Sequence, residues 1–478
     1  MENDSDDNKR IDEGFGRSYF GFRLMLNLFV GAALILSIFQ IAGTTQSTFS
    51  MRVIATGLDA PWDILWGPDN RLWVTERIGK RVDRVNPADG TVTRTVLIDE
   101  VYPGTSWHEG LLGLALHPDF SKGLGRDFVY VAYTYDADPG AALVRRLKVR
   151  RYAFNAANGT LVDPLDVITN LPAHDDHGGG RLVFGPDQKL YLSRGDHGSN
   201  WLANYCNPIR SQELPTAAQI AAHDWQAYQG KILRLNIDGS IPSDNPTLNG
   251  VRSHVFSYGH RNPQGLVFGP TGLLYESEHG QQTDDEVNLI VAGGNYGWPH
   301  VAGFRDDRGY VYSPWAQSTA PCSTLKFDEF AAPPSVPRQK ESEWKGTFIP
   351  PLRSFFPVPE GYDLKASGVS TIAPSTLEIY AHPTGIAGWA NSLLLPGMTR
   401  GRVYRVKLSA DGKSVVGENE EIFRAANRYR DVVVGADGRT FYAATDPAGL
   451  GRTTDPDGKP TVTYANPGSI LEFKYTGK

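Results

Sequence analysis

The hydrophobic and polar positions of the chain repeat one local pattern: a short apolar run, a tight polar turn and a second apolar run. Residues 65–74 show it clearly, with the turn Gly-Pro-Asp-Asn at 67–70. Proline fixes one backbone angle of such a turn and asparagine tolerates the left-handed conformation, so the pattern predicts a β-hairpin. It returns in residues 183–192, 267–275 and 433–442, and in looser form in 112–133 and 386–406.

Six similar hairpins, each extended by further strands such as 81–85 and 231–235, predict a β-propeller of six blades. Residues 52–56 and 469–475 lie at opposite ends of this region, and we expect them to complete one blade together. A shared blade closes the ring and removes an exposed sheet edge. The predicted fold class is all-β: a six-bladed β-propeller with long inter-blade loops, preceded by an N-terminal hydrophobic helix.

Two longer segments interrupt the hairpins. Residues 198–230 contain an alanine-rich stretch, Ala217 to Tyr228, which predicts a short helix. Residues 305–370 are rich in proline and irregular in pattern, which predicts a surface excursion over one face of the propeller. Neither segment has the character of a separate domain, so we expect residues 51–478 to form one propeller domain.

The N-terminal residues 1–50 differ in character from the rest. Residues 1–13 are polar and mainly acidic, and residues 24–42 are almost wholly apolar, with Arg17 and Arg23 before them. This length approaches that of a membrane-spanning helix, while the small residues at 42–44 leave cleavage open. We therefore expect a signal peptide or a membrane anchor, and a periplasmic or extracellular domain with the basic residues left inside.

Composition narrows the classes of partner. The chain has 478 residues, a formal net charge of −6 and no basic block, which argues against nucleic acid as a partner. Its 51 glycines and 32 prolines suit many short strands joined by tight turns. The two cysteines, Cys206 and Cys322, can pair in an oxidising compartment, but their spacing does not decide this.

A histidine between carboxylates and glycines is the first candidate for chemistry. His177 lies in Asp175-Asp176-His177-Gly178-Gly179-Gly180, directly before a predicted inner strand. Imidazole takes up a proton near neutral pH, and a neighbouring carboxylate can orient it. Asp196 ends the same hairpin and should lie at the same mouth of the propeller. The alternative is a group of turn residues that only caps strands.

Arginines and acidic residues supply two further candidate sites. Arg261 and Asn262, and likewise Arg428 and Arg430, precede two hairpins at equivalent places. Three converging guanidinium groups indicate a ligand with several carboxylates, whereas a single surface arginine is usually an ion-pair partner. The acidic residues near glycine-rich turns offer the hard oxygens that calcium prefers, without EF-hand spacing: Asp284, Asp285, Glu286 and Asp306. The alternative there is a solvated acidic loop.

The quoted residues and several longer stretches resemble the soluble, pyrroloquinoline quinone-dependent glucose dehydrogenases of the glucose/sorbosone dehydrogenase family. The resemblance covers roughly Pro61 to Tyr475. It is densest in GLLGLALHPDF, GRLVFGPDQKLYLSRGD, GKILRLNIDGSIPSDNP, GHRNPQGL, DDEVNLIVAGGNYGWPHVAG and NRYRDV. The family fold is a six-bladed propeller, in agreement with the number of hairpins.

The resemblance implies a role for individual residues. His177 matches the family's general base, which takes the proton of the sugar's anomeric hydroxyl, and Asp196 matches a supporting carboxylate. The implied substrate-binding residues are Asp176, His108, Trp201 and Arg261. The implied cofactor-binding residues are Arg261, Asn262, His279, Thr371, Thr399, Arg428 and Arg430. The carbonyls of Gly280 and Gln281 match the ligands of the calcium at the quinone. A structural calcium near the family's dimer contact matches Glu286, Tyr296, Ala302, Asp306 and Glu341.

The chain departs from the family at some ligand-facing positions. A cofactor-contacting lysine is Thr399 here, with Arg400 beside it. Two glutamines of the family are His108 and Trp201, a tryptophan over the sugar is Val369, and a proline of the calcium loop is Gln281. The base and the arginines are the same as in the family, while several sugar-facing residues differ. The resemblance therefore favours dehydrogenase chemistry but does not favour glucose as the preferred substrate.

The sequence thus predicts a quinoprotein oxidoreductase that oxidises an aldose or related sugar at C1 to a lactone. The resemblance implies pyrroloquinoline quinone and Ca²⁺ as cofactors and an external electron acceptor of quinone or cytochrome type. It is also compatible with a homodimer. No GxGxxG motif follows a strand and opens a helix, so a nicotinamide cofactor is not expected. Two alternatives on the same scaffold remain: a calcium-dependent lactonase-type hydrolase and a non-enzymatic sugar-binding propeller.

Overall fold

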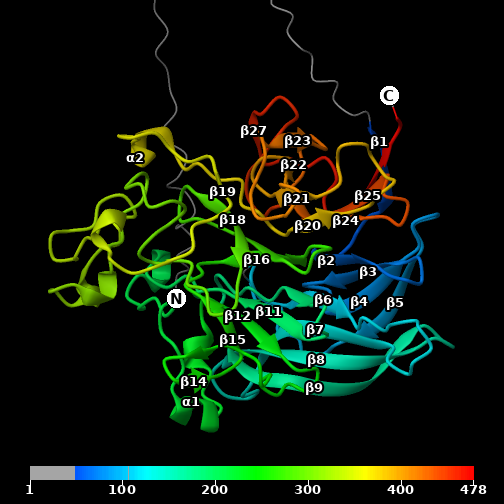
Figure 1. The fold of residues 1–478 in the computed structure, drawn as a ribbon, viewed down its shortest axis with the longest axis horizontal. Coiled ribbons are helices and arrows are strands. Elements are labelled where there is room, and N and C mark those ends of the chain that lie inside the picture. Colours follow the sequence, from blue (N-terminus) through cyan, green and yellow to red (C-terminus); the bar gives the residue numbers. More distant parts are fainter. Residues whose placement is uncertain (1–48, 106, 478) are drawn as a thin grey trace, which may run out of the picture. The chain divides into compact units, whose positions relative to one another are not determined.

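The computed structural model describes residues 49–105 and 107–477, and they fold mainly into antiparallel sheets of four strands (Figure 1). Blades 1 to 3 are β2 (Pro61–Trp66), β3 (Leu72–Glu76), β4 (Arg81–Val85), β5 (Val92–Leu97); β6 (Leu111–Leu116), β7 (Phe128–Asp136), β8 (Arg145–Asn155), β9 (Thr160–Pro172); and β10 (Leu182–Phe184), β11 (Leu190–Arg194), β12 (Lys231–Leu235), β15 (Val255–Tyr258). Blades 4 to 6 are β16 (Pro263–Phe268), β17 (Leu274–Glu278), β18 (Asp285–Ile290), β19 (Arg353–Phe355); β20 (Glu378–Tyr380), β21 (Ser392–Gly397), β22 (Arg402–Lys407), β23 (Glu420–Ile422); and β24 (Tyr429–Val434), β25 (Thr440–Thr445), β28 (Ile470–Tyr475), β1 (Phe49–Ala55).

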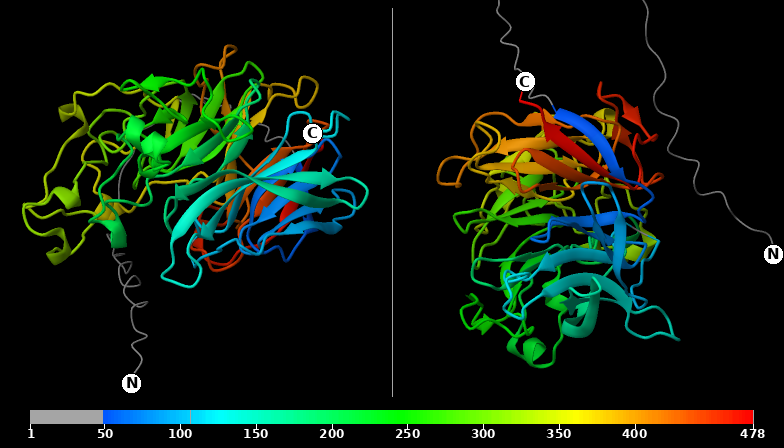
Figure 2. Two further views of the ribbon diagram at one scale, coloured as in Figure 1. Left: turned by 90° about the horizontal axis from the view of Figure 1, so that it is seen from below. Right: turned by 90° about the vertical axis from the view of Figure 1, so that its right-hand side faces the viewer.

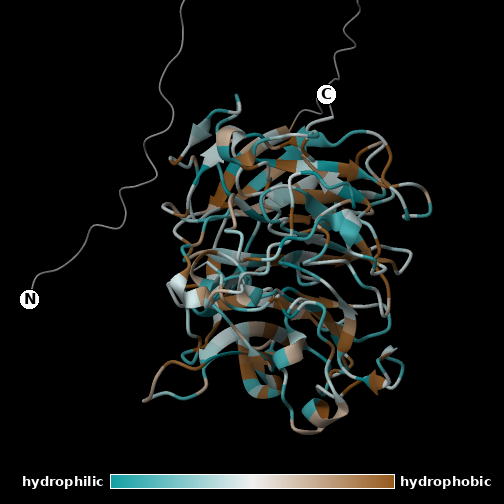
Figure 3. Cartoon of the chain, turned by 90° about the vertical axis from the view of Figure 1, so that its left-hand side faces the viewer, coloured by the Kyte–Doolittle hydropathy of each residue, from teal (hydrophilic) through white to brown (hydrophobic). Residues whose placement is uncertain are grey.

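The first strand of each blade lies innermost, and these strands form a ring. Neighbours contact each other in the order β2, β6, β10, β16, β20 and β24, and β24 returns to β2. The six sheets of the described residues are therefore the blades of a six-bladed propeller, as the hairpin pattern predicts (Figure 2). Apolar residues follow the strands, while the connecting loops are largely hydrophilic (Figure 3).

Packing between neighbouring sheets supplies the core. Between blades 2 and 3, Leu112, Tyr130, Leu192 and Leu233 are fully buried in one cluster. Each of these residues alternates with residues that face the other side of its strand, so every sheet buries both faces. A propeller packs each blade between two others, which explains why strands such as β6, Leu-Leu-Gly-Leu-Ala-Leu, are apolar throughout.

The two ends of the described chain meet in blade 6. β1 pairs antiparallel with β28, with Phe49 opposite Tyr475. Arg52 faces Glu472 across this pair, and Arg52 Nε donates to Glu472 Oε1 at 2.8 Å. The predicted shared blade is thereby confirmed, and it covers the edge of β28 that would otherwise be open.

One buried arginine joins the inner strands near the axis. Arg181, directly before β10, forms ion pairs with Asp63 of β2 at 2.8 Å and Asp431 of β24 at 2.9 Å. It also donates to the carbonyls of Gln264 in β16 and Ser375, close to β20. Asp63 in turn accepts from the backbone of β6. A single guanidinium with its partners thus links all six blades and fills the centre of the ring.

The long insertions are mostly irregular. The alanine-rich stretch forms α1 (Ala217–Ala221), capped by Thr216, in agreement with the prediction. Residues 305–370 contain α2 (Leu364–Ser367), but they also supply β19, the outer strand of blade 4, which the sequence did not reveal. Further 3₁₀ turns are Leu202–Asn204, Gln226–Tyr228, Trp315–Gln317, Cys322–Thr324 and Glu341–Glu343, and small hairpins are β13 (Thr247–Leu248) with β14 (Val251–Arg252) and β26 (Thr453–Thr454) with β27 (Pro460–Thr461).

A disulfide joins the two insertions, because Cys206 lies in the first and Cys322 in the second. Tyr205 reinforces the junction, since its hydroxyl donates to the carbonyl of Leu325 at 2.7 Å. Blade 5 also differs from the sequence pattern. Its inner strand β20 precedes the expected hairpin at 386–406, so the connection from β20 to β21 is longer than a tight turn.

The predicted N-terminal hydrophobic segment at 24–42 lies outside the described residues. Within residues 49–105 and 107–477, no helix has the length and apolar character needed to cross a membrane.

Acid should destabilise the propeller through His254, which is buried with its Nδ1 2.9 Å from the Tyr228 hydroxyl. Burial lowers the pKa of His254 to about 4 from 6.5. The unfolded imidazole takes up a proton below pH 6.5 and the folded one only near pH 4, so the contribution to stability is complete above pH 6.5 and falls with the pH. We expect a loss of about 2 kcal/mol in the free energy of unfolding between pH 7 and pH 5 from this group. Urea unfolding at both pH values should show a smaller loss in His254→Gln, and an equal loss would contradict the assignment.

Candidate active site

His177 is held in a fixed orientation in the loop between β9 and β10. Its side chain is 6% exposed, and its Nδ1 lies 2.6 Å from Asp196 Oδ1. The backbone of His177 has a φ of +42°, and Gly195 lets it approach closely, because a Cβ there would lie 2.1 Å from the His177 carbonyl. The Asp196 carboxylate accepts a hydrogen bond from the Nδ1–H group. The proton therefore stays on Nδ1, and Nε2 is the basic nitrogen.

Asp196 is itself anchored. Its Oδ2 accepts a hydrogen bond from the indole nitrogen of Trp298 at 2.8 Å, and its Oδ1 accepts from the backbone of Gly198 at 3.0 Å. Trp298 lies in the loop that follows β18, so residues far apart in the sequence build this pair. A carboxylate held on both oxygens can orient the imidazole and stabilise its protonated form.

Asp176 and His108 complete the polar surface around His177 Nε2. Asp176 Oδ1 lies 3.5 Å from His177 Nε2 and 3.3 Å from His108 Nε2. Burial, with the charges of His177, Arg430 and Arg77, lowers the pKa of His108 to about 4 against the opposing effect of Asp176. Burial alone would raise the pKa of Asp176, but the charges of His177, His108 and Arg261 lower it instead. At neutral pH the site therefore presents a carboxylate and a neutral imidazole beside the base.

The arginines at the start of β24 share one carboxylate. Arg430 Nε lies 2.8 Å from Asp446 Oδ1, and Arg428 Nε lies 3.3 Å from Asp446 Oδ2. Burial opposes ionisation of Asp446, but Arg430, Arg428 and Arg77 together lower its pKa. Arg428 and Arg430 thus share one carboxylate, while Arg77 is acted on by Glu109 as well as Asp446, and this concentration of buried guanidinium groups suits an anionic ligand.

Arg261, at the start of blade 4, lies near the same carboxylate as His177. Its guanidinium carbon lies 5.5 Å from the centre of the Trp298 ring, and its charge acts on Asp176. Its Nε and the Nδ2 of the fully buried Asn262 have no hydrogen-bond partner among residues 49–105 and 107–477. Buried donors of this kind are rarely left unsatisfied in proteins, and here they face a site built for an anion.

The predicted calcium loop forms the neighbouring wall. Asp285 Oδ1 accepts from the backbone of Gly280 at 3.0 Å, and its Oδ2 accepts from the Thr371 hydroxyl at 2.6 Å. His279 Nε2 lies 2.9 Å from the carbonyl of Pro374. The carbonyls of Gly280 and Gln281 accept no hydrogen bond in the described part of the chain, so both can serve a cation.

The predicted structural calcium residues meet at the turn 302–307. Glu286 Oε1 accepts from the backbone of Gly303 at 2.6 Å, and Glu341 accepts from the backbone of Ala302 and Asp306 at 2.9 and 3.0 Å. The side chain of Tyr296 points elsewhere, since its hydroxyl donates to the carbonyl of Leu289. Only the main chain of Tyr296 is thus placed to contribute.

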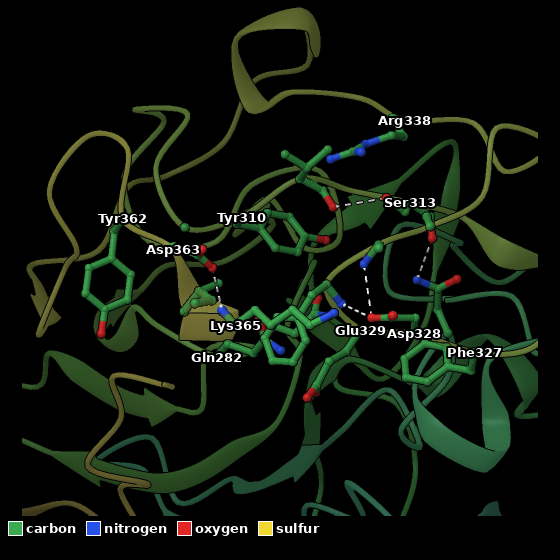
Figure 4. A pocket seen from close by; sticks show the side chains of 18 of the residues that line it. Gln282, Tyr310, Ser313, Phe327, Asp328, Glu329, Arg338, Tyr362, Asp363 and Lys365 are labelled. Carbon is green, nitrogen blue, oxygen red and sulfur yellow. Dashed lines mark hydrogen bonds between the residues drawn. The ribbon is translucent and has the colours of Figure 1, made fainter. Parts of the chain in front are cut away.

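Trp201 packs behind a cavity that is lined mainly by the two insertions, without lining it itself. Its ring packs against Phe327 with centroids 5.6 Å apart. The cavity has a volume of about 530 Å³ and its wall includes Gln281, Tyr310 and Phe327 (Figure 4). Tyr310 also packs on Trp298, which donates to Asp196, so the cavity adjoins the site of His177.

Comparison with known proteins now identifies the family. The sequence model described as "Glucose / Sorbosone dehydrogenase" matches residues 58–327 and 362–452. The chain is 41% identical over 452 residues to quinoprotein glucose dehydrogenase B of Acinetobacter calcoaceticus, covering 92% of this chain and 94% of the relative. The chain belongs to the glucose/sorbosone dehydrogenase family.

Two further relatives agree with this membership. The family member "Aldose sugar dehydrogenase YliI" of Escherichia coli (strain K12) is 29% identical over 265 residues, covering 53% of this chain and 62% of the relative. The solved structure of the PQQ-bound form of aldose sugar dehydrogenase from Streptomyces coelicolor superposes with a TM-score of 0.60 at 25% identity, covering 90% and 99% of the two chains.

In this glucose/sorbosone dehydrogenase family member, several residues of the site were missed by sequence reasoning. Arg77 ends the hairpin of blade 1 and is buried beside Arg430 and Asp446, so that burial and the charge of Arg430 lower its pKa to about 10. Its position at a strand end, like that of Asp196, was a usable signal. Asp446, directly after β25, carried the same signal, whereas Trp298 carried none, because only the folded chain brings it to Asp196.

Thr399, the family's lysine position, lies beside Thr371 and donates to its carbonyl at 3.1 Å. We expect Thr399→Lys to tighten quinone binding about tenfold, since one charge-assisted hydrogen bond is worth roughly 1.5 kcal/mol. Thr399→Met, which has a similar length and no charge, should leave the affinity unchanged. Quinone titration followed by fluorescence measures both, and equal affinities for the two variants would show that position 399 faces away from the ligand.

Proposed function

We propose that this glucose/sorbosone dehydrogenase family member is a quinoprotein that oxidises an aldose at its C1 hydroxyl to the lactone, with pyrroloquinoline quinone and Ca²⁺. The observation that carries the proposal is a cluster around one base: His177 is paired with Asp196, and the two residues beside its Nε2 side, Asp176 and His108, are within electrostatic reach of Arg261 and Arg430 respectively. A base beside buried cationic groups fits a sugar next to an anionic redox cofactor.

The residues fit a ligand with several carboxylates. Arg261 Nε and Asn262 Nδ2 are buried donors without partners among the described residues, and the Arg428–Arg430–Arg77 group acts on Asp446. These residues would hold the quinone, and the carbonyls of Gly280 and Gln281 would hold the calcium. When bound, the quinone supplies a two-electron acceptor that the calcium makes more electrophilic.

The protein itself moves the proton. His177 Nε2 takes the proton of the C1 hydroxyl as the C1 hydrogen leaves with its electron pair, and a C=O bond forms at C1. Asp196 keeps the Nδ1 proton in place and stabilises the imidazolium that results. Asp176, ionised beside His177 and His108, can accept hydrogen bonds from sugar hydroxyls and so orient C1 toward the base.

Localisation, partners and assembly belong to the same proposal. We place the propeller in the periplasm or outside the cell, secreted or anchored through residues 24–42, because the Cys206–Cys322 disulfide suits an oxidising compartment. The electrons taken from the sugar pass from the protein to an external acceptor of quinone or cytochrome type. A homodimer is proposed at the turn 302–307, where the structural calcium residues gather.

The decisive experiment mixes the purified protein, stripped of metals and cofactor, with Ca²⁺ and pyrroloquinoline quinone. Addition of aldoses should then reduce an electron-accepting dye, and a panel of sugars gives the preference. Quinone binding without dye reduction for any sugar would favour the sugar-binding alternative. Lactone hydrolysis that needs calcium but no quinone would favour the hydrolase.

A further inference from the structure

A group of buried side chains behind the wall of Arg261 takes no part in the proposed oxidation. We call it the Glu276 cluster, and it consists of His260, Glu276, Glu278, Glu286 and Asn288. In the β17–β18 pair, Glu276 lies opposite Asn288 and Glu278 lies opposite Glu286. Side chains two residues apart on a strand share a face, so all four point to one side, and His260 meets them from the segment before β16.

The cluster crowds three carboxyl groups together, and burial raises the pKa of all three, with the charge of Glu278 adding to the effect on Glu276 and Glu286. The Nδ2 atom of Asn288 lies 3.0, 3.4 and 2.9 Å from oxygens of Glu276, Glu278 and Glu286, so one neutral amide faces three carboxyl groups. Within the described residues, the imidazole of His260 is the only basic side chain paired with them, at 3.2 Å from Glu278, and burial lowers its pKa to about 3, so it is neutral. Like charges directly opposite each other on two strands are destabilising, and burial increases that cost.

The nearest cationic side chains are occupied elsewhere. Arg261 donates through its side chain to the carbonyl of His279, and Lys231 donates to the carbonyls of Arg210, Ser211 and Gln229. Burial lowers the pKa of Lys231 to about 7, which weakens it further as a counter-charge. The cluster therefore lacks a full compensating charge from the protein itself.

Two oxygens in the cluster point to a missing ligand. Glu276 Oε1 and Asn288 Oδ1 have no hydrogen-bond partner in the part of the chain that the structure describes, although both residues are fully buried. One donor atom from each of His260, Glu276 and Glu278 lies within 4.8 Å of the others, a spacing that one ion can bridge after small adjustments. The second ring nitrogen of His260 lies 2.9 Å from Ser257 Oγ, the kind of outer contact that fixes a metal-binding imidazole.

We propose that His260, Glu276 and Glu278 bind a divalent transition metal ion of the Zn²⁺ or Mn²⁺ type, with Asn288 Oδ1 as a further oxygen donor. An imidazole among carboxylates favours such an ion over calcium, which takes oxygen ligands. The two predicted calcium positions, at Gly280–Gln281 and at the turn 302–307, offer oxygen alone. The metal site is independent of the proposed sugar oxidation.

The ion would fix part of the cofactor wall. Glu278 Oε2 accepts from the backbone of Arg261 at 2.6 Å and of Asn262 at 3.2 Å. A metal bound to Glu278 Oε1 would therefore hold in place the segment that carries Arg261 and Asn262, two of the predicted quinone-binding residues. The site is structural and touches no reacting atom.

The test measures metal content and binding on the full chain. Protein stripped with a chelator and dialysed against Zn²⁺ or Mn²⁺ should retain about one equivalent by mass spectrometry of the elements, in the presence of excess Ca²⁺. Glu276→Gln keeps the size and an acceptor oxygen but removes the charge, and it should weaken binding at least 100-fold. Glu378→Gln, at a partly buried carboxyl of β20 whose pKa is raised to about 8 by desolvation, is the matched control and should bind as the unaltered protein does.

Co²⁺ provides a second measurement on the unaltered protein, so the outcome does not depend on folding of the variant. Its visible absorption should rise to saturation at one equivalent and be displaced by Zn²⁺. Absence of saturable Zn²⁺, Mn²⁺ and Co²⁺ binding, displacement of all three by Ca²⁺, or retention of the metal by Glu276→Gln would each overturn the proposal. Sugar-dependent dye reduction by a protein that holds Ca²⁺ and quinone but shows no saturable binding of Zn²⁺, Mn²⁺ or Co²⁺ would leave the oxidation standing and remove the metal site.

Discussion

Replacement of His177 by alanine should lower kcat by about 10³-fold, because general-base catalysis contributes roughly 10²- to 10⁴-fold. The base is the one group whose Nε2 faces Asp176 while its Nδ1 is fixed by Asp196 at 2.6 Å. Its removal leaves Arg261, Arg428 and Arg430 in place, so the affinity for quinone should change little. Stopped-flow dye reduction gives the rate, and quinone titration gives the affinity.

Asp196→Asn is the companion variant for this prediction. It preserves the contact with Trp298 in shape but removes the charge that stabilises the imidazolium, so we expect a loss in kcat of about 10²-fold or more. His254→Gln, a buried histidine of blade 3 outside the site, is the control and should retain full activity at pH 7. Wild-type turnover in His177→Ala would remove His177 from the mechanism altogether.

Replacement of Arg430 by alanine should weaken quinone binding by about 10- to 100-fold, the range expected for loss of one or more charge-assisted hydrogen bonds of roughly 1.5–3 kcal/mol. Arg430 donates to Asp446 through Nε and Nη2. These two contacts fix the orientation of the guanidinium and leave its Nη1 for a ligand. Without Arg430, Asp446 also presents an unbalanced negative charge to an anionic ligand. Isothermal titration with the quinone in excess Ca²⁺ measures the change in Kd.

Arg428→Ala should have a smaller effect on the same Kd than Arg430→Ala. Arg428 donates to Asp446 and to the carbonyls of Met398 and Arg452. Its main role is therefore to hold these neighbouring segments in place. Arg405→Ala, which breaks a pair with Glu420 in blade 5, is the control for loss of a buried arginine. An unchanged Kd in Arg430→Ala would refute the tricarboxylate site.

Local patterns in the sequence were enough to predict the propeller, because each blade begins with a tight hairpin whose turn residues are recognisable. Blade 5 was less clear, since its inner strand β20 is three residues long and is followed by a long connection. β19 was missed for a related reason: it is a short strand in a proline-rich insertion, and only pairing with β18 defines it.

Candidate site residues were predictable where they lie next to either end of a hairpin strand. Asp196 follows a hairpin strand, whereas His177, Arg261 and Arg430 lie before or at the start of one. In the structure His177 pairs with Asp196, and Arg261 and Arg430 act on the neighbouring Asp176 and His108. The pairing of Cys206 with Cys322 could not be predicted, because 116 residues separate them and only the packing of the two insertions brings them together. The surplus of acid in the Glu276 cluster also requires the strand register.

The arginine at the propeller axis has a consequence for the order of events in turnover. Arg181 and its partners tie the inner strands together at the centre of the ring, so we expect reactants not to enter from one end and leave from the other. The lactone must depart by the opening through which the sugar arrived, and the electron acceptor must approach by that opening too. Oxidation of the sugar and reoxidation of the reduced cofactor are then successive half-reactions. The product of the first must leave the opening before the electron acceptor can bind there.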